Sequence, residues 1–232
     1  MAEPRASSTS YAMLGLLALR PWSAYELVQQ SERSLRWFFP RSERAVYLDV
    51  KRLVKLGWAE SESVARGKRS RTVYSITQAG REALAEWLET PSLPLQVESE
   101  AALKAFYGDL APLATLRGTL EQARAAADAN LRRLAEMAVL PSHFPKRMPT
   151  NTLCLRFLVE INLAVERWAE WAEEALGTLE TGDQEAIETR TRAELAAIHE
   201  IGHEIGRTGR NSAVSSGVSP GPPRFDPGMD SR

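Results

Sequence analysis

The chain has 232 residues, of which 44% are hydrophobic and 25% charged, and its formal net charge is −1. This composition is typical of a soluble globular protein, and no apolar run approaches the ~18–20 residues of a membrane-spanning helix. A single cysteine, Cys154, excludes an intrachain disulfide framework, and the lack of a signal-peptide pattern favours the cytoplasm over a secreted or membrane location.

Two helices and a bulky connector are expected in the first 40 residues. Ser10 is a typical helix N-cap, and the almost wholly apolar run over 11–19 predicts a buried helix. Ser23 predicts the cap of a second helix over 24–31. Residues 33–40 hold several aromatic side chains and are expected to connect this helix to the next.

A third, amphipathic helix is expected from Ser42 to Leu56, with Gly57 at the position just beyond its end. Its apolar residues recur with a period near 3.6, which predicts one buried face. That stripe consists of Ala45, Val46, Val50, Leu53, Val54 and Leu56.

A β-hairpin and a fourth helix are expected to follow. Residues 58–64 and 72–76 are typical of two short strands, and the basic segment Arg66–Arg71 lies at their tip. Thr77 predicts the cap of a helix that continues through Leu88.

The second half of the chain has a helical pattern throughout. Pro91 and Pro94 predict a domain boundary, and a helix follows over about 98–108. A long helix is expected over about 113–138, and the proline-rich segment 141–150 predicts a loop.

The next helix carries a heptad-like seam, which favours packing against another helix and, in particular, a homodimer. The alternative is that the seam packs only within its own subunit. A further helix is expected at about 184–204, and Cys154 is expected to be buried in the seam. The seam residues are Cys154, Leu158, Ile161, Val165, Trp168, Ala172 and Ala175.

Positive charge gathers in the first part of the chain. Residues 1–90 hold 14 Lys+Arg against 10 Asp+Glu, whereas residues 91–232 hold 15 against 20. A basic part attached to an acidic part indicates that only the first part meets a polyanion.

The order helix, hairpin, helix with cations on the third helix and the hairpin tip predicts a winged helix-turn-helix, which inserts one helix in the DNA major groove. Arg44, Tyr47 and Lys51 share the helix face opposite the apolar stripe. A charge run is more often simply a solvated helix face, but here the order and the shared sign of both segments favour DNA. The candidate DNA contacts are Arg41, Ser42, Arg44, Tyr47 and Lys51 in the helix and Arg66, Lys68, Arg69 and Arg71 in the wing.

Four segments resemble the PadR family of transcriptional regulators. They are Tyr11–Leu19 (YAMLGLLAL), Ser23–Leu27 (SAYEL), Ala45–Leu53 (AVYLDVKRL) and Tyr74–Gly80 (YSITQAG). The resemblance covers about residues 10–90, and the acidic helical half is similar to the longer C-terminal dimerisation domain of that family. The sequence departs from the family pattern at Ala24, where Gly is usual, and at Leu48, where Pro is common.

This resemblance implies a homodimeric repressor that binds a palindromic operator in double-stranded DNA. It also implies release of DNA when a small molecule binds, often one that is phenolic or drug-like. By the same resemblance, Tyr25 and Tyr47 are expected to contact phosphates, and Lys51 to lie in or beside the groove.

The segment His199–His203 (HEIGH) matches the HExxH pattern of zinc hydrolases, with Glu200 in the place of the general base. A catalytic zinc needs three protein ligands, but Gly209 stands where an extended pattern has its third histidine. Beyond Gly209, only Asp226 and Asp230 follow as possible carboxylate ligands. We therefore expect no metal site, and a zinc-dependent hydrolase is kept only as an alternative function.

Aromatic residues in the second half suggest an effector pocket for a small aromatic molecule. Phe106, Tyr107, Trp168 and Trp171, with Phe157 nearby in sequence, are its candidate lining residues. Aromatic residues at helical spacing are more often ordinary core, so this alternative stays open.

The sequence as a whole predicts a mainly α protein without cofactor or catalysis. Its expected parts are a flexible N-terminus over 1–9, a winged helix-turn-helix over 10–90, a helical dimerisation and effector domain over 95–205 and a disordered tail over 206–232. The expected function is sequence-specific regulation of transcription. A non-specific DNA-binding or interaction module is the other alternative.

Overall fold

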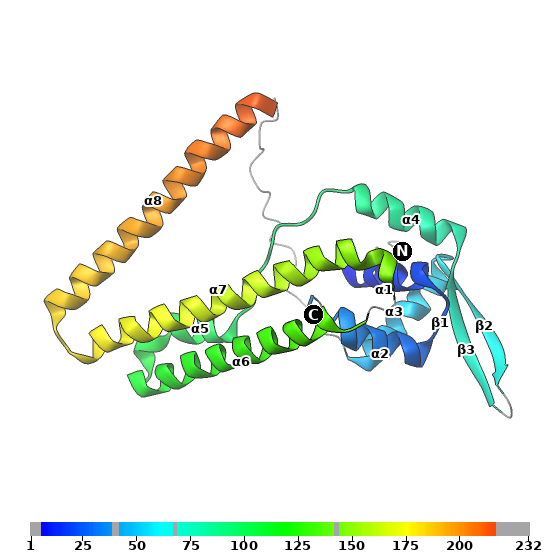
Figure 1. Cartoon of the computed structure of the whole chain (residues 1–232), viewed down its shortest axis with the longest axis horizontal. Coiled ribbons are helices and arrows are strands. Elements are labelled where there is room, and N and C mark those ends of the chain that lie inside the picture. Colours follow the sequence, from blue (N-terminus) through cyan, green and yellow to red (C-terminus); the bar gives the residue numbers. More distant parts are fainter. Residues whose placement is uncertain (1–5, 39–41, 67–68, 142–143, 217–232) are drawn as a thin grey trace. The chain divides into compact units, whose positions relative to one another are not determined.

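The computed structural model describes residues 6–38, 42–66, 69–141 and 144–216 (Figure 1). The chain divides into two compact units, Met1–Val97 and Glu98–Arg232. The described residues are mainly helical and include one three-stranded sheet, in the first unit, which confirms the fold class expected from the sequence.

The first unit begins with helices α1 (Ser8–Leu19) and α2 (Ala24–Ser34). The cap of α1 is Ser7, whose side chain accepts a hydrogen bond from the backbone nitrogen of Ser10, so the prediction that Ser10 caps this helix is wrong. Ser10 instead lies inside the helix and is fully buried. Either serine can cap a helix, and the register that buries the apolar run of α1 selects the earlier one.

Helix α3 (Glu43–Lys55) begins at the predicted cap, Ser42. Beyond its end, Gly57 has a φ of 72°, and the backbone nitrogens of Gly57 and Trp58 donate to the carbonyls of Val54 and Leu53. This pattern is a Schellman motif, which needs a left-handed residue and therefore favours glycine.

Strands β2 (Ala59–Arg66) and β3 (Arg69–Ile76) pair antiparallel, and the short strand β1 (Trp22–Ser23) adds to β3, giving the order β1-β3-β2 (Figure 1). The hairpin is longer than predicted, because the ladder continues to the pair Arg66 and Arg69, where a loop was expected. Exposed charged side chains leave the backbone free to pair, so charge alone does not end a strand.

Helix α4 (Gln78–Glu89) is locked to the root of the hairpin. The predicted cap, Thr77, donates its hydroxyl to the carbonyl of Gly57 at 2.6 Å and accepts a bond from the backbone nitrogen of Gly80. Gly80 lies so close to the hairpin that a Cβ there would stand 2.1 Å from the carbonyl oxygen of Trp58. This contact fixes the hairpin relative to the helices of the same unit.

In the described residues of the second unit, all the regular elements are helices or 3-10 turns. This unit consists of α5 (Glu100–Phe106), a 3-10 turn (Gly108–Leu110), α6 (Leu113–Val139), a second 3-10 turn (Pro145–Arg147), α7 (Met148–Glu180) and α8 (Gln184–Ser216). Helices α6 and α7 lie antiparallel, side by side (Figure 1). Their buried residues are Leu120, Ala127 and Leu134 on α6 and Leu158, Asn162, Ala169 and Leu176 on α7.

The packing face of α7 differs from the predicted seam. Asn162 and Ala169 are buried one residue beyond the predicted Ile161 and Trp168, and the side-chain amide of Asn130 on α6 donates to Asn162 at 3.0 Å. Cys154, expected to be buried, is exposed. The apolar residues of α7 cover more than one face, so their spacing alone did not identify the face that meets α6.

Helix α8 follows Gly182, whose φ is 68°, and continues to Ser216. The structure therefore shows helix over 206–216, where a disordered tail was expected, and the rest of that tail lies outside the described residues. None of the described helices is long and apolar enough to cross a membrane.

Candidate DNA-binding interface

Helix α3 separates a buried apolar face from an exposed polar face. Val46, Val50 and Leu53 are at most 3% exposed and pack into the core of the first unit. The opposite face presents Arg44 and Lys51 to solvent, as the sequence predicted. Because the core holds one face of α3, the direction of the other face is fixed.

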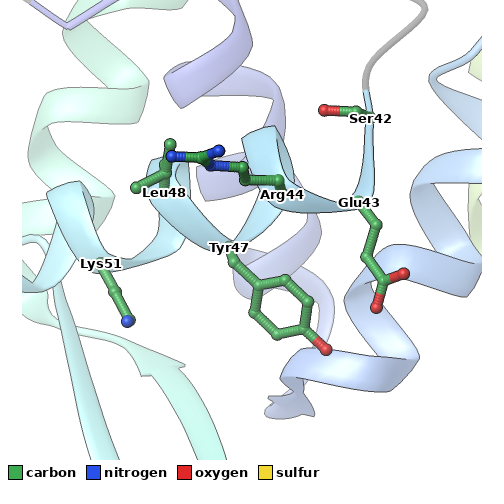
Figure 2. Close-up of a pocket in the computed structure, with 6 residues that line it drawn as sticks. All are labelled: Ser42, Glu43, Arg44, Tyr47, Leu48 and Lys51. Atoms are coloured by element: carbon green, nitrogen blue, oxygen red, sulfur yellow. The ribbon is translucent and has the colours of Figure 1, made fainter.

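A shallow concavity lies on this exposed face (Figure 2). Four of the predicted DNA contacts line it together, and two residues that were not predicted, Glu43 and Leu48, complete it. Leu48 lies one helical turn after Arg44 and one turn before Lys51, so its spacing in the sequence was a signal that it shares this face. The lining residues are Ser42, Glu43, Arg44, Tyr47, Leu48 and Lys51.

Two side chains at the start of α3 can donate hydrogen bonds. Ser42 accepts a bond from the backbone nitrogen of Ala45 at 3.3 Å, and a serine hydroxyl can donate as well as accept. Burial, together with the neighbouring Glu43 carboxylate, raises the pKa of Tyr47, so its phenol stays protonated at neutral pH. Neutral hydroxyl donors of this kind suit phosphate oxygens.

Tyr25 and Arg71 come from other elements of the same unit. Tyr25 is exposed on α2, and its hydroxyl accepts a hydrogen bond from the side chain of Gln29 at 2.7 Å. Arg71 on β3 lies 3.7 Å from the carboxylate of Glu26 on α2. Arg71, one of the four cations predicted for the wing, is thus paired with a carboxylate of the same unit.

The remaining cationic candidates are only partly described. The backbones of Arg66 and Arg69 pair at the end of the hairpin ladder. Arg41 and Lys68 lie outside the described residues. The pairing of the backbones of β2 and β3 thus defines where the hairpin ends.

The four aromatic candidates for an effector pocket occur as two pairs. The rings of Phe106 and Tyr107 touch edge to face, with centroids 5.0 Å apart, and both side chains are exposed. Trp168 and Trp171 lie on α7, where the indole nitrogen of Trp171 donates to Glu194 of α8 at 2.9 Å. This bond links Trp171 to α8.

The two histidines of the HExxH segment lie one turn apart on α8, with ring centroids 4.7 Å apart, and both are exposed. Within the described part of the chain, no group of three or more His, Cys, Asp and Glu residues lies close enough to hold a metal. Asp226 and Asp230 are outside that part.

The first unit, which carries the concavity, matches a known protein family. Residues 13–86 match the family model described as the transcriptional regulator PadR-like family. Through these residues the chain is similar to the PadR-like family. The expected resemblance is confirmed, and a family of regulators, which are not enzymes, favours the regulator over the hydrolase.

Two curated relatives are similar to part of the chain. One is a probable transcriptional regulator of Mycobacterium tuberculosis, 28% identical over 119 residues, which are 45% of this chain and 63% of that protein. The other is the negative transcriptional regulator PadR of Bacillus subtilis, 28% identical over 99 residues, which are 42% of this chain and 54% of that protein. The matched segments thus span less than two thirds of both relatives.

Solved structures extend the likeness in fold beyond the PadR-like residues. Bacillus subtilis PadR in complex with operator DNA has a TM-score of 0.63 at 21% identity, covering 73% of this chain and 99% of that one. The same protein in complex with p-coumaric acid has a TM-score of 0.59 at 23% identity, covering 72% and 98%. The fold therefore includes helices of the second unit as well as the winged helix.

Proposed function

We propose that the protein is a sequence-specific DNA-binding regulator of transcription, acting as a homodimeric repressor in the cytoplasm. The observation that carries this proposal is the exposed face of α3, where Arg44, Tyr47 and Lys51 line one concavity on a helix whose other face is buried. The match of residues 13–86 to the PadR-like family model and the similarity to a negative regulator support the same function.

In this proposal α3 lies in the major groove and the hairpin reaches the adjoining backbone. Arginine and lysine side chains can bond the edges of guanine, whereas Tyr47 and Tyr25 donate to phosphates. Each phosphate contact adds about −0.9 to the slope of log affinity against log salt, so binding weakens steeply as salt rises.

A homodimer is proposed because one helix-turn-helix contacts too little DNA for high specificity. Two copies related by a twofold axis place their recognition helices about 34 Å apart, which matches a palindromic operator. Exposed apolar side chains along α7 supply a surface for the second copy. They include Leu153, Phe157, Ile161 and Trp171.

We also propose that a small aromatic molecule releases the repressor from DNA. The support is the complex of a protein of similar fold with p-coumaric acid and the aromatic side chains of the second unit. The candidate pocket residues remain Phe106, Tyr107, Trp168 and Trp171. Titration of p-coumaric acid and related aromatic acids into the protein–operator complex tests this step, and retention unchanged by all of them contradicts it.

The main proposal is tested by gel shift against DNA from the promoter region of the protein's own operon. We expect specific retention that Lys51→Ala weakens about tenfold or more, because a groove contact is worth roughly 1–3 kcal/mol. Lys104→Ala, which removes an exposed cation of α5 in the second unit, is the matched control and should bind like the wild type. Equal, weak binding to all duplexes would instead indicate a non-specific module.

A further inference from the structure

Leu48 is an apolar residue in an otherwise polar surface. Of the six residues that line the concavity on α3, it is the only aliphatic one (Figure 2). Its side chain is 57% exposed, and it lies between Arg44 and Lys51, about one helical turn from each.

Leu48 does not belong to the core of the first unit. The residues of α3 that pack into that core, Val46, Val50 and Leu53, lie on the opposite side of the helix. Single exposed leucines are common on protein surfaces, so exposure alone indicates nothing. What distinguishes Leu48 is its place on the face that is proposed to enter the major groove, where it lines the concavity together with Arg44 and Lys51.

The major groove offers one apolar group to such a side chain, the C5-methyl of thymine. Guanine, adenine and cytosine lack this methyl and present mainly hydrogen-bonding groups there, which an aliphatic side chain desolvates without replacing their bonds. A leucine held between two cations is therefore matched to thymine and mismatched to the other bases.

We propose that Leu48 is a specificity-determining residue that packs against the C5-methyl of a thymine in each half-site of the operator. This inference rests on the proposed function, since it requires that α3 enters the groove. It adds a sequence preference to a surface whose cations by themselves favour guanine and phosphate.

The test begins with selection of bound duplexes from a random library by the full-length wild-type protein. Each thymine of the selected site is then replaced by deoxyuridine, which keeps the base pair and removes only the methyl group. Affinities for the thymine and deoxyuridine duplexes are measured for the wild type, for Leu48→Ala and for a control, Leu88→Ala. Leu88 is an exposed leucine of α4 in the same unit.

We expect one thymine per half-site at which deoxyuridine weakens the wild type about fourfold, or roughly fifteenfold when both half-sites are changed. The Leu48→Ala protein should bind the two duplexes equally, whereas Leu88→Ala should discriminate like the wild type. Since Leu48 is exposed and alanine favours helix, the variant should remain folded, which circular dichroism verifies.

The inference is overturned if no thymine methyl matters, or if Leu48→Ala loses affinity for deoxyuridine as strongly as the wild type does. In the second case the affinity loss on deoxyuridine comes from contact of the methyl with another side chain or from a change in the stiffness of the duplex. A wild type that selects no sequence at all overturns the proposed function itself, and this outcome differs visibly from specific binding that ignores thymine methyls.

Discussion

At the scale of single residues, Glu26 joins three parts of the first unit. Its carboxylate accepts bonds from the backbone and hydroxyl of Ser23, which completes the capping box of α2, and it also lies near Arg20 and Arg71. The hydrogen bonds from Ser23, and then the charges of the two arginines, lower the pKa of Glu26 below its ordinary value of 4.5. The Glu26 carboxylate thus interacts both with strand β3, through Arg71, and with the N-terminus of α2, through Ser23.

This lowered pKa predicts how stability depends on pH. A carboxyl whose folded-state pKa lies below the unfolded one stabilises the fold above the unfolded pKa, and this contribution is lost as pH falls through the folded value. Glu26→Ala should therefore cost about 1 kcal/mol of unfolding free energy at pH 7 and flatten the loss of stability below about pH 5. Urea denaturation at a series of pH values measures both effects.

The matched control is Glu86→Ala, which removes an exposed glutamate of α4 in the same unit. It should leave the unfolding free energy within about 0.5 kcal/mol of the wild type across the series. If Glu26→Ala follows the same pH profile as the wild type, the capping carboxylate of Glu26 does not contribute to the pH dependence of stability.

Substitution by alanine should have opposite effects on stability at two glycines of the first unit, Gly80 and Gly15. A Cβ at Gly80 would stand 2.1 Å from a backbone oxygen, so Gly80→Ala should destabilise the unit by about 1–3 kcal/mol. A Cβ at Gly15 in α1 meets nothing within 4 Å, so Gly15→Ala should stabilise it by about 0.4–1 kcal/mol. Thermal melts of both variants measure the difference, and a Gly80→Ala protein as stable as the wild type contradicts the close approach.

At the scale of elements, helices with one clear apolar face could be predicted well from sequence. The start of α3, its buried stripe and the glycine beyond its end follow from local rules, because one cap, one period and one left-handed position agree. The group Arg44, Tyr47 and Lys51 could be predicted for the same reason, since residues three and four apart on a helix must share a face.

Other features depend on contacts that a local pattern does not contain. The two-residue strand β1 exists only because β3 passes beside it, and the length of the hairpin depends on pairing between strands. Helix α7 carries apolar residues around much of its circumference, so the face that meets α6 was selected by the partner helix and by the bond between Asn130 and Asn162. The pairing of Arg71 with Glu26 likewise joins residues 45 positions apart.

At the scale of the whole molecule, the surplus apolar surface of α7 is the physical argument for assembly. The side of α7 that meets α6 accounts for Leu158, Ala169 and Leu176, whereas Leu153, Phe157 and their neighbours along the helix remain exposed. An exposed apolar stripe of this kind favours burial against another chain, and the proposed palindromic site requires a twofold partner.

This argument predicts that a charge in the stripe separates the subunits. Phe157→Asp should convert the dimer to a monomer in sedimentation velocity, because an unpaired carboxylate in an apolar interface is costly. The same variant should lose about 100-fold or more in affinity for the palindrome, since the avidity of two linked sites is lost, while its weak affinity for a single half-site is unchanged.

Gln122→Asp is the control, since Gln122 is exposed on α6 and its substitution introduces the same charge outside the stripe. It should sediment as a dimer and bind like the wild type. A wild-type protein that sediments as a monomer contradicts the homodimer outright. If Phe157→Asp leaves the dimer as stable as the wild type, the interface lies elsewhere on the second unit. A buried, unpaired carboxylate in the interface would destabilise the dimer.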